Sequence, residues 1–179
     1  MRLWGLVLAA AGVLMWTGAA NATVAEATPT GFQVQQKVEI AAPASKVWAA
    51  LSKISQWWDS QHTWSSDAKN LTLSLTPGGC FCEAFPHGGG ARHMTVMLVS
   101  PSKTVVMEGA LGPLIFSGAT GHLVWNLSEA AGKTTLTQIY YVGGEYPGGL
   151  DKMAGAVDGV LSEQITRLKA YIETGKPAI

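Results

Sequence analysis

The sequence predicts an α+β fold in which a curved antiparallel sheet of about seven strands wraps around one long C-terminal helix. Three observations support this prediction. Most of the chain consists of short runs in which apolar and polar residues alternate, as in half-buried strands. The connections between these runs are short and rich in glycine and proline, which favours an antiparallel meander. Only the segment from Gly149 to about Glu173 has the period of a long helix.

The first 22 residues have the pattern of a secretory signal peptide. Arg2 supplies a positive start, residues 3–16 form an apolar run, and Ala20-Asn21-Ala22 matches a cleavage signal. The apolar run is short for a membrane span, although a retained anchor would have a similar length. We therefore expect residues 1–22 to be removed and residues 23–30 to form a flexible leader. The mature protein is then expected to be secreted or periplasmic, with no membrane span.

The elements of the predicted domain, residues 31–174, follow one another closely. The first strand alternates from Phe32 to Ile40, and Pro43 begins a short helix that places Val47, Trp48 and Leu51 on one face. A second short helix or turn is expected in ISQWWD. The remaining strands are expected at 70–76, 79–85, 92–100, 104–109, 121–127 and 134–142. The long helix follows, and residues 175–179 form a tail because Gly175 and Pro177 stop the helix.

Composition excludes several classes of partner. Removal of Arg2 would leave 11 basic against 12 acidic residues, and no basic patch or nucleic-acid motif is present, so we expect no nucleic-acid partner. The glycine runs lack the strand-to-helix context of a phosphate loop, and we expect no cofactor. Only 13% of residues are charged while seven are tryptophan, which indicates apolar surface reserved for a ligand cavity or an interface.

The sequence resembles one superfamily over nearly all of residues 31–174. The segments that carry the resemblance are VEIAAPASKVWAAL, the paired Trp57 and Trp58, PGGCFCE, VSPSKTVVMEGALGPL, TLTQIYYVGG and LSEQITRLKAYIE. They are similar to the START-like (SRPBCC) superfamily of polyketide cyclases and lipid-transfer proteins, in the branch grouped with the C-terminal domain of the Hsp90 ATPase activator. The resemblance implies a helix-grip (Bet v 1-like) fold with an apolar cavity between sheet and helix. It implies function less closely, because this superfamily has no common catalytic motif.

The stretch GGCFCEAFPHGGG holds both cysteines and is predicted to form a β-hairpin with the following strand. Symmetric pairing would place Glu83 opposite His93 and Cys82 opposite Met94, with the two cysteines on the other face from Glu83. A single β-bulge would reverse the faces for half of the hairpin. Apolar neighbours on both faces leave open whether Glu83 and His93 point inward.

Cys80 and Cys82 admit four interpretations. The leading one is that both are small buried packing residues. A disulfide needs a distorted strand, because residues two apart along a regular strand have Cα atoms about 6.6 to 6.8 Å apart. A metal site would add His87 or His93, although the C-x-C spacing is not a familiar zinc pattern. A nucleophilic cysteine would need a base on its own face, where the predicted register places only Arg92.

Five residues are candidates for ligand contact. Trp58 is placed near the cavity mouth because adjacent tryptophans cannot share one helical face, and Phe81 lies in the predicted hairpin. By resemblance, Gln138 and the Tyr140 hydroxyl point inward, where a ligand, a neighbouring backbone group or water would satisfy them. Glu108 precedes the segment GALGPL, which is expected to form a gate at the cavity entrance.

Three functions remain open. The leading hypothesis is a secreted or periplasmic carrier or sensor that binds a hydrophobic small molecule or lipid. The alternative is a cyclase, dehydratase or hydrolase in which Glu83 and His93 act as acid and base and Tyr140 orients a carbonyl group. The third is a metal- or redox-responsive protein that uses Cys80 and Cys82. The secretion pattern argues against the cytosolic chaperone role of the related branch, and no pattern specifies the ligand or the oligomeric state.

Overall fold

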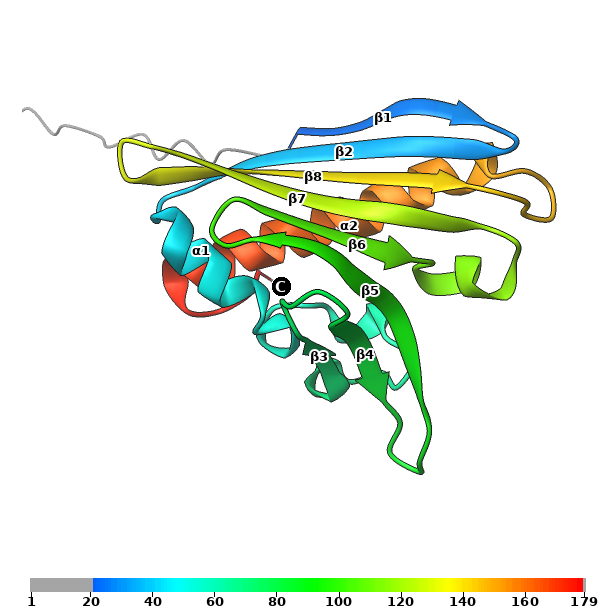
Figure 1. Ribbon diagram of the computed structural model, residues 1–179, viewed down its shortest axis with the longest axis horizontal. Coiled ribbons are helices and arrows are strands. Elements are labelled where there is room, and N and C mark those ends of the chain that lie inside the picture. Colours follow the sequence, from blue (N-terminus) through cyan, green and yellow to red (C-terminus); the bar gives the residue numbers. More distant parts are fainter. Residues whose placement is uncertain (1–20, 179) are drawn as a thin grey trace, which may run out of the picture.

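The computed structural model describes residues 21–178 and shows one eight-stranded antiparallel sheet curled around a long helix (Figure 1). The strand order is β1-β2-β8-β7-β6-β5-β4-β3, so that the six strands from β3 to β8 form a meander and the β1–β2 hairpin extends it beyond β8. The predicted fold class is therefore confirmed, with one strand more than expected. The expected signal peptide, apart from its last two residues, lies outside the described residues.

The strands are bounded as follows: β1 Asn21–Thr28, β2 Gly31–Ile40, β3 Leu71–Leu73, β4 Cys80–Ala84, β5 Gly90–Ser100, β6 Thr104–Gly109, β7 Thr120–Ala130 and β8 Lys133–Gly143. The α-helices are α1 Ala44–Leu51 and α2 Asp151–Thr174, and 3₁₀ helices span Ile54–Gln56, Ser60–His62, Ala68–Asn70 and Gly112–Phe116. Within the described residues, no helix is both long enough and apolar enough to cross a membrane.

The additional strand is β1, which occupies most of the segment expected to be a leader without secondary structure. Its residues 23–28 are exposed, so no alternation of buried and exposed side chains marks it in the sequence. It is instead held by backbone pairing with β2, with a bulge between Val24 and Glu26. The hairpin also meets the start of α2, where the Leu150 N–H donates to the Pro29 carbonyl at 2.9 Å.

Helix α2 lies along the concave face of the sheet (Figure 1). Its last residue is Thr174, and it is capped by Gly175, which has a left-handed backbone (φ 81°) and whose N–H donates to the Tyr171 carbonyl at 2.9 Å. Along the C-terminal part of the helix an apolar stripe with the predicted helical period is buried, at Leu161, Ile165, Leu168 and Ile172. In the N-terminal part, Met153, Val157 and Val160 are only partly buried. This face of α2 is therefore less closely covered at that end.

A chain of buried polar groups crosses the core between the sheet and α2. Gln138 of β8 accepts a hydrogen bond from Trp125 Nε1 at 2.7 Å and donates to Gln36 Oε1 at 2.9 Å and to the Leu161 carbonyl of α2 at 3.1 Å. Gln36 in turn donates to Asp158 Oδ1 of α2 at 2.5 Å. Strands β2, β7 and β8 are thus tied to the helix by directed bonds as well as by apolar packing.

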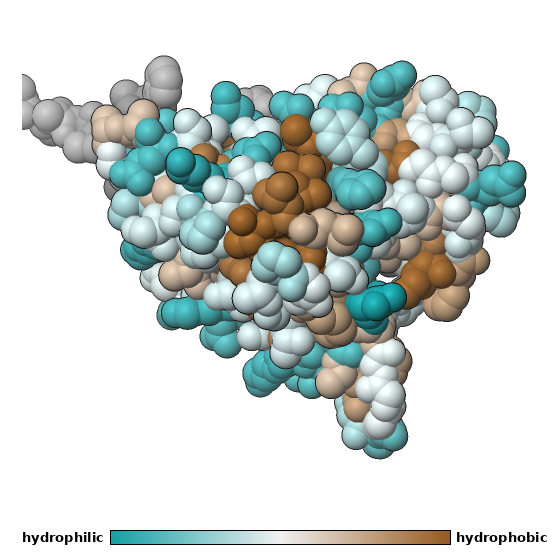
Figure 2. Space-filling view, viewed as in Figure 1, coloured by the Kyte–Doolittle hydropathy of each residue, from teal (hydrophilic) through white to brown (hydrophobic). Residues whose placement is uncertain are grey.

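The convex face of the sheet is open to solvent. Strand register places Leu98, Val106, Val124 and Ile139 in one row across β5 to β8 on this face. Figure 2 looks onto this side of the molecule and shows an apolar band surrounded by polar residues. Three members of the row are half-buried and Leu98 is half exposed, so the row remains partly covered by its neighbours.

Candidate functional site

A cavity of about 310 Å³ lies beside the N-terminal half of α2. Its walls come from four parts of the chain: the loop before β3, strands β3 to β5, the segment after β6, and the N-terminal half of α2. The lining residues are Trp58, Gln61, His62, Thr63, Trp64, Leu71, Phe81, His93, Leu111, Gly112, Pro113, Met153, Ala156, Val157, Val160 and Leu161. Most of these side chains are apolar, so the cavity suits an apolar guest.

The aromatic part of the wall is held rigidly. Trp58 packs edge-on against Phe81 with ring centroids 5.4 Å apart. Its indole N–H donates to the His62 carbonyl at 3.0 Å, so the polar atom of the ring is already satisfied. Trp58 therefore offers the cavity apolar surface without an unmet hydrogen bond.

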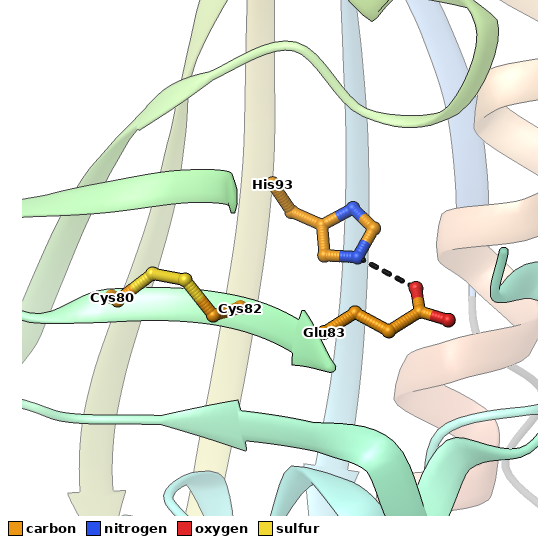
Figure 3. Close-up of a disulfide and its surroundings, with 4 residues drawn as sticks. All are labelled: Cys80, Cys82, Glu83 and His93. Carbon is orange, nitrogen blue, oxygen red and sulfur yellow. Dashed lines mark hydrogen bonds and ion pairs between the residues drawn. A yellow bond between two sulfur atoms is a disulfide. The ribbon is translucent and has the colours of Figure 1, made fainter. Parts of the chain in front are cut away.

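His93 is the polar residue that the sheet contributes to the wall. Its imidazole lies 4.9 Å from the Phe81 ring, measured between centroids, and its Nε2 lies 3.0 Å from Oε2 of Glu83 (Figure 3). Both side chains are buried. The other ring nitrogen, Nδ1, lies on the edge of the ring that points away from Glu83 in Figure 3.

Glu83 is anchored by the loop that precedes β3. The backbone N–H of Trp64 donates to its Oε2 at 3.1 Å, and the backbone N–H of Ser65 donates to its Oε1. Burial alone would raise the pKa of Glu83, but the hydrogen bonds that the carboxylate accepts outweigh burial and lower the pKa. The carboxylate is therefore ionised at neutral pH, and it ties the loop that forms one cavity wall to β4.

The protonation of His93 follows from its surroundings. Burial lowers the pKa of the imidazole, and the neighbouring Glu83 carboxylate offsets only part of this effect. The ring is therefore neutral at pH 7, and its single proton lies on Nε2, which donates to the Glu83 carboxylate. Nδ1 is left as an acceptor, and it has no hydrogen-bond partner among the residues that the structure describes. The cavity wall thus presents a neutral acceptor to a guest.

A β-bulge turns His93 toward the cavity. Phe81 pairs with Met94 and Cys82 pairs with Arg92, so His93 has no partner on β4. His93 and Met94 are consecutive and both buried, which a regular strand does not allow. The symmetric register predicted from the sequence, with Glu83 opposite His93, is therefore wrong: Glu83 pairs with Ala91. The prediction that Glu83 and His93 share a face opposite the cysteines is confirmed.

Comparison with known proteins identifies the family of the chain. The sequence profile described as "Polyketide cyclase / dehydrase and lipid transport" matches residues 31–173. The chain belongs to this family. The START-like resemblance seen in the sequence is thereby confirmed. No curated protein matches the chain by sequence.

Solved structures with the same fold are distant in sequence. CalU16 from Micromonospora echinospora is 14% identical, with a TM-score of 0.60 over 90% of this chain and 88% of that one. DynU16, a putative protein in the dynemicin biosynthetic locus, is 24% identical, with a TM-score of 0.58 over 81% of this chain and 48% of that one. The chain thus spans about half of DynU16. The Aha1 dimer from Colwellia psychrerythraea is 19% identical, with a TM-score of 0.52 over 80% of this chain and 98% of that one.

In this family member the two cysteines form a disulfide on the outer face of the hairpin, with Cα atoms 5.3 Å apart (Figure 3). Both residues are half-buried. The leading interpretation, two free buried cysteines, is therefore wrong, because β4 is bent enough to bring the sulfur atoms together. His87, the third ligand of the metal alternative, lies in the exposed turn between β4 and β5. Within residues 21–178, no cluster of three or more potential ligands is arranged to hold a metal ion.

The predicted ligand-contacting residues divide into two groups. Trp58 and Phe81 line the cavity, whereas Gln138, Tyr140 and Glu108 do not. Gln138 is inward as predicted, but its amide belongs to the buried polar chain. Glu108 is half-buried and pairs with Thr95 and His122, on the opposite side of β6 from buried Met107.

Tyr140 acts on the cavity indirectly. Its hydroxyl donates to the Gly109 carbonyl at 3.0 Å and accepts from the Leu111 N–H at 3.2 Å. Burial raises the pKa of this hydroxyl to about 12. Tyr140 therefore fixes the start of the predicted gate segment, whose residues 111–113 line the cavity.

Sequence reasoning did not find the loop residues Gln61, His62, Thr63 and Trp64. They lie in a polar, serine-rich stretch without periodicity. Trp64 is 42% exposed and packs edge-on against Phe116, which is 81% exposed, at 5.5 Å between centroids. Trp64 and Phe116 lie far apart in the sequence, so only the structure shows that they form an exposed aromatic pair beside the cavity.

Proposed function

We propose that the protein is a carrier or sensor that binds a small apolar molecule, or part of a lipid, carrying one hydroxyl or similar donor group. The observation that carries this proposal is the apolar cavity of about 310 Å³ with the neutral acceptor of His93 in its wall. Burial of each methylene of a guest contributes about 0.8 kcal/mol, so the apolar walls supply most of the affinity. The hydrogen bond to His93 supplies orientation.

The chemistry of His93 also sets what the cavity disfavours. A carboxylate or phosphate guest would face the lone pair of Nδ1 with the ionised Glu83 carboxylate behind the ring. Both interactions are repulsive, and an anion would lose its hydration in a mostly apolar cavity. Neutral alcohols, phenols and enols are therefore the favoured ligand class.

A matched pair of probes tests the proposal. Naphthalene and 1-naphthol share one apolar body, and only 1-naphthol carries a donor. Both should quench the tryptophan fluorescence of the protein, and 1-naphthol should bind more tightly by about threefold to tenfold, the usual range for one net hydrogen bond. His93→Phe should remove this preference and retain naphthalene binding.

A cavity-filling variant tests whether the probes bind in the cavity. Val157→Trp should abolish binding of both probes because the indole would occupy the cavity, whereas Val124→Trp places the same side chain on the convex face and should leave binding intact. Failure of the wild-type protein to bind either probe, or equal effects of the two tryptophan variants, would contradict the proposal.

The enzymatic alternative is favoured by one specific observation. The Glu83 carboxylate stands behind the Nε2–H of His93, where it would stabilise the positive ring formed when Nδ1 accepts a proton from a bound substrate. Native mass spectrometry of ligands carried by wild-type and His93→Phe protein separates the two functions. A carrier should hold the same molecule in both proteins. An enzyme of the cyclase or dehydratase type should accumulate an unchanged substrate in the variant. This substrate should differ from the wild-type ligand in mass by one water or, where the reaction is a rearrangement, in the chromatographic retention of the released ligand.

We also propose that the mature protein is exported. The signal-peptide pattern of residues 1–22 supports export, as does the disulfide, because disulfides persist mainly in oxidising compartments. Intact mass of protein recovered from its native compartment tests this proposal. A chain that begins at Thr23 with an oxidised cysteine pair is expected, and a full-length chain with free thiols would contradict export.

A further inference from the structure

The disulfide shortens β4. In a regular strand, Cα atoms two residues apart are separated by about 6.6 to 6.8 Å. The Cα atoms of Cys80 and Cys82 are 5.3 Å apart, so the strand is contracted at Phe81, between them. The contraction amounts to somewhat less than half the length of one extended residue.

The facing strand, β5, contains one extra residue at the same position. Between the pairs Phe81–Met94 and Cys82–Arg92, β5 contains one additional residue, His93, while β4 contains none. A bulge of this kind sets two residues of one strand against one of its partner. The disulfide shortens β4 beside the bulge, and the bulge accommodates an extra residue of β5. The disulfide therefore increases the difference in length between the two strands at this point.

The bulge decides where the imidazole lies. In a regular hairpin with Phe81 opposite Met94, residue 93 would stand opposite Cys82 on the outer face, where Arg92 is now exposed. The extra residue instead turns His93 inward, to Glu83 and the cavity. Strand β6 leaves room for this arrangement, because a Cβ on Gly109 would overlap the carbonyl oxygen of His93.

We propose that the Cys80–Cys82 disulfide positions His93, and that reduction of this disulfide by a dithiol withdraws the hydrogen-bond acceptor from the cavity. Both cysteines are half-buried on the outer face, so a dithiol reaches them without unfolding of the core. The expected effect of the disulfide on ligand choice rests on the proposed function. The expected effect of the disulfide on the position of His93 rests only on the geometry of the hairpin.

The redox step is an ordinary thiol–disulfide exchange. One thiolate of the dithiol attacks a cysteine sulfur, the Cys80–Cys82 bond breaks, and the second thiol of the reagent then releases the mixed disulfide. Two electrons and two protons pass to the protein, which gains two thiols, while the reagent becomes a disulfide. Strand β4 is then free to lengthen toward regular spacing, and the bulge loses the contraction opposite it. The loop contacts of Glu83 from Trp64 and Ser65 remain.

The experiment compares oxidised protein, protein reduced with dithiothreitol, and the Cys80→Ala/Cys82→Ala variant. The first measurement is the ¹⁵N NMR spectrum of the His93 imidazole. In oxidised protein it should show a neutral ring with its proton on Nε2. In the other two samples these signals should change toward those of a mobile, exposed ring.

The second measurement is the affinity ratio of 1-naphthol to naphthalene. Reduction should lower 1-naphthol affinity by about threefold to tenfold, the loss expected for one hydrogen bond, and should leave naphthalene affinity within about twofold. Reoxidation should restore the preference. The alanine variant should match reduced protein and ignore dithiothreitol, and the His93→Phe variant should show no redox-dependent preference.

Two outcomes would overturn the proposal. Unchanged His93 signals in reduced protein would show that the bulge forms without the disulfide. Loss of naphthalene binding together with 1-naphthol binding, in reduced protein that keeps its circular dichroism spectrum, would show that the disulfide maintains the whole cavity instead of His93. If oxidised wild-type protein binds neither probe, the proposed function fails, and the NMR comparison still decides whether the disulfide positions His93.

Discussion

Substitution of Glu83 tests whether its carboxylate holds the cavity wall together. The buried carboxylate accepts hydrogen bonds from the backbone of Trp64 and Ser65 and from His93. In Glu83→Gln, a carbonyl oxygen at the Oε2 position keeps the bonds from Trp64 and His93, and the amide nitrogen then faces the Ser65 N–H. One hydrogen bond to a charged group is lost, which costs about 1.5 to 3 kcal/mol of unfolding free energy. Glu83→Ala leaves all three donors without their acceptor, and we expect a loss of roughly 3 to 5 kcal/mol.

Urea unfolding at pH 7, followed by tryptophan fluorescence, measures these losses. The slope of the free energy against urea should stay constant, since neither variant changes the surface exposed on unfolding. Glu108→Gln is the matched control, because this half-buried carboxylate lies on the convex face outside the cavity, and its effect should stay within about 0.5 kcal/mol. The reasoning fails if Glu83→Gln unfolds like the control, or if Glu83→Ala is no less stable than Glu83→Gln.

Three further predictions concern His93, Tyr140 and Gln138. Because the pKa of His93 is lowered in the folded protein, the unfolded chain takes up a proton at a higher pH than the folded protein does. The free energy of unfolding should therefore be constant above the usual histidine pKa of about 6.5 and fall on acidification below it. Urea unfolding from pH 7.5 to 5.5 should show this fall in wild-type protein and a smaller one in His93→Phe. Ultraviolet absorbance should show that Tyr140 ionises only near its raised pKa of about 12, unless alkali unfolds the protein first, and Tyr140→Phe should cost about 1 kcal/mol. Gln138→Leu should cost roughly 2 to 4 kcal/mol in urea unfolding because three hydrogen bonds of the core are lost, and 1-naphthol affinity should fall as well because the bond to the Leu161 carbonyl no longer holds α2 beside the cavity.

Most of the fold was predictable because its strands are half-buried and its connections short. The alternation from Phe32 to Ile40 predicted β2 correctly, the family resemblance gave the inward face of β8, and the helical period predicted α2. β1 was missed because its side chains are exposed from residue 23 to 28, and a strand held by backbone bonds alone leaves no hydrophobic pattern.

The candidate site was predictable only in part. The hairpin turn brought Glu83 and His93 near each other in any register, so the pair could be inferred from spacing. The position of the bulge could not be inferred, because the apolar residues of β5 fit either register, and the sequence left the disulfide as one of four alternatives for Cys80 and Cys82. Gln138 and Tyr140 were correctly placed inward, but only the position of α2 determines which inward residues reach the cavity.

The polar chain through the core holds α2 in one orientation beside the cavity. Apolar contacts are non-directional, and they would let α2 roll or tilt to fill the space beside Met153 and Val157. The bonds from Gln138 to the Leu161 carbonyl and from Gln36 to Asp158 fix the rotation of the helix about its own axis, since either movement would break them in a buried setting. The protein is therefore preorganised: the cavity persists without a guest, and binding proceeds without the cost of reopening a collapsed core.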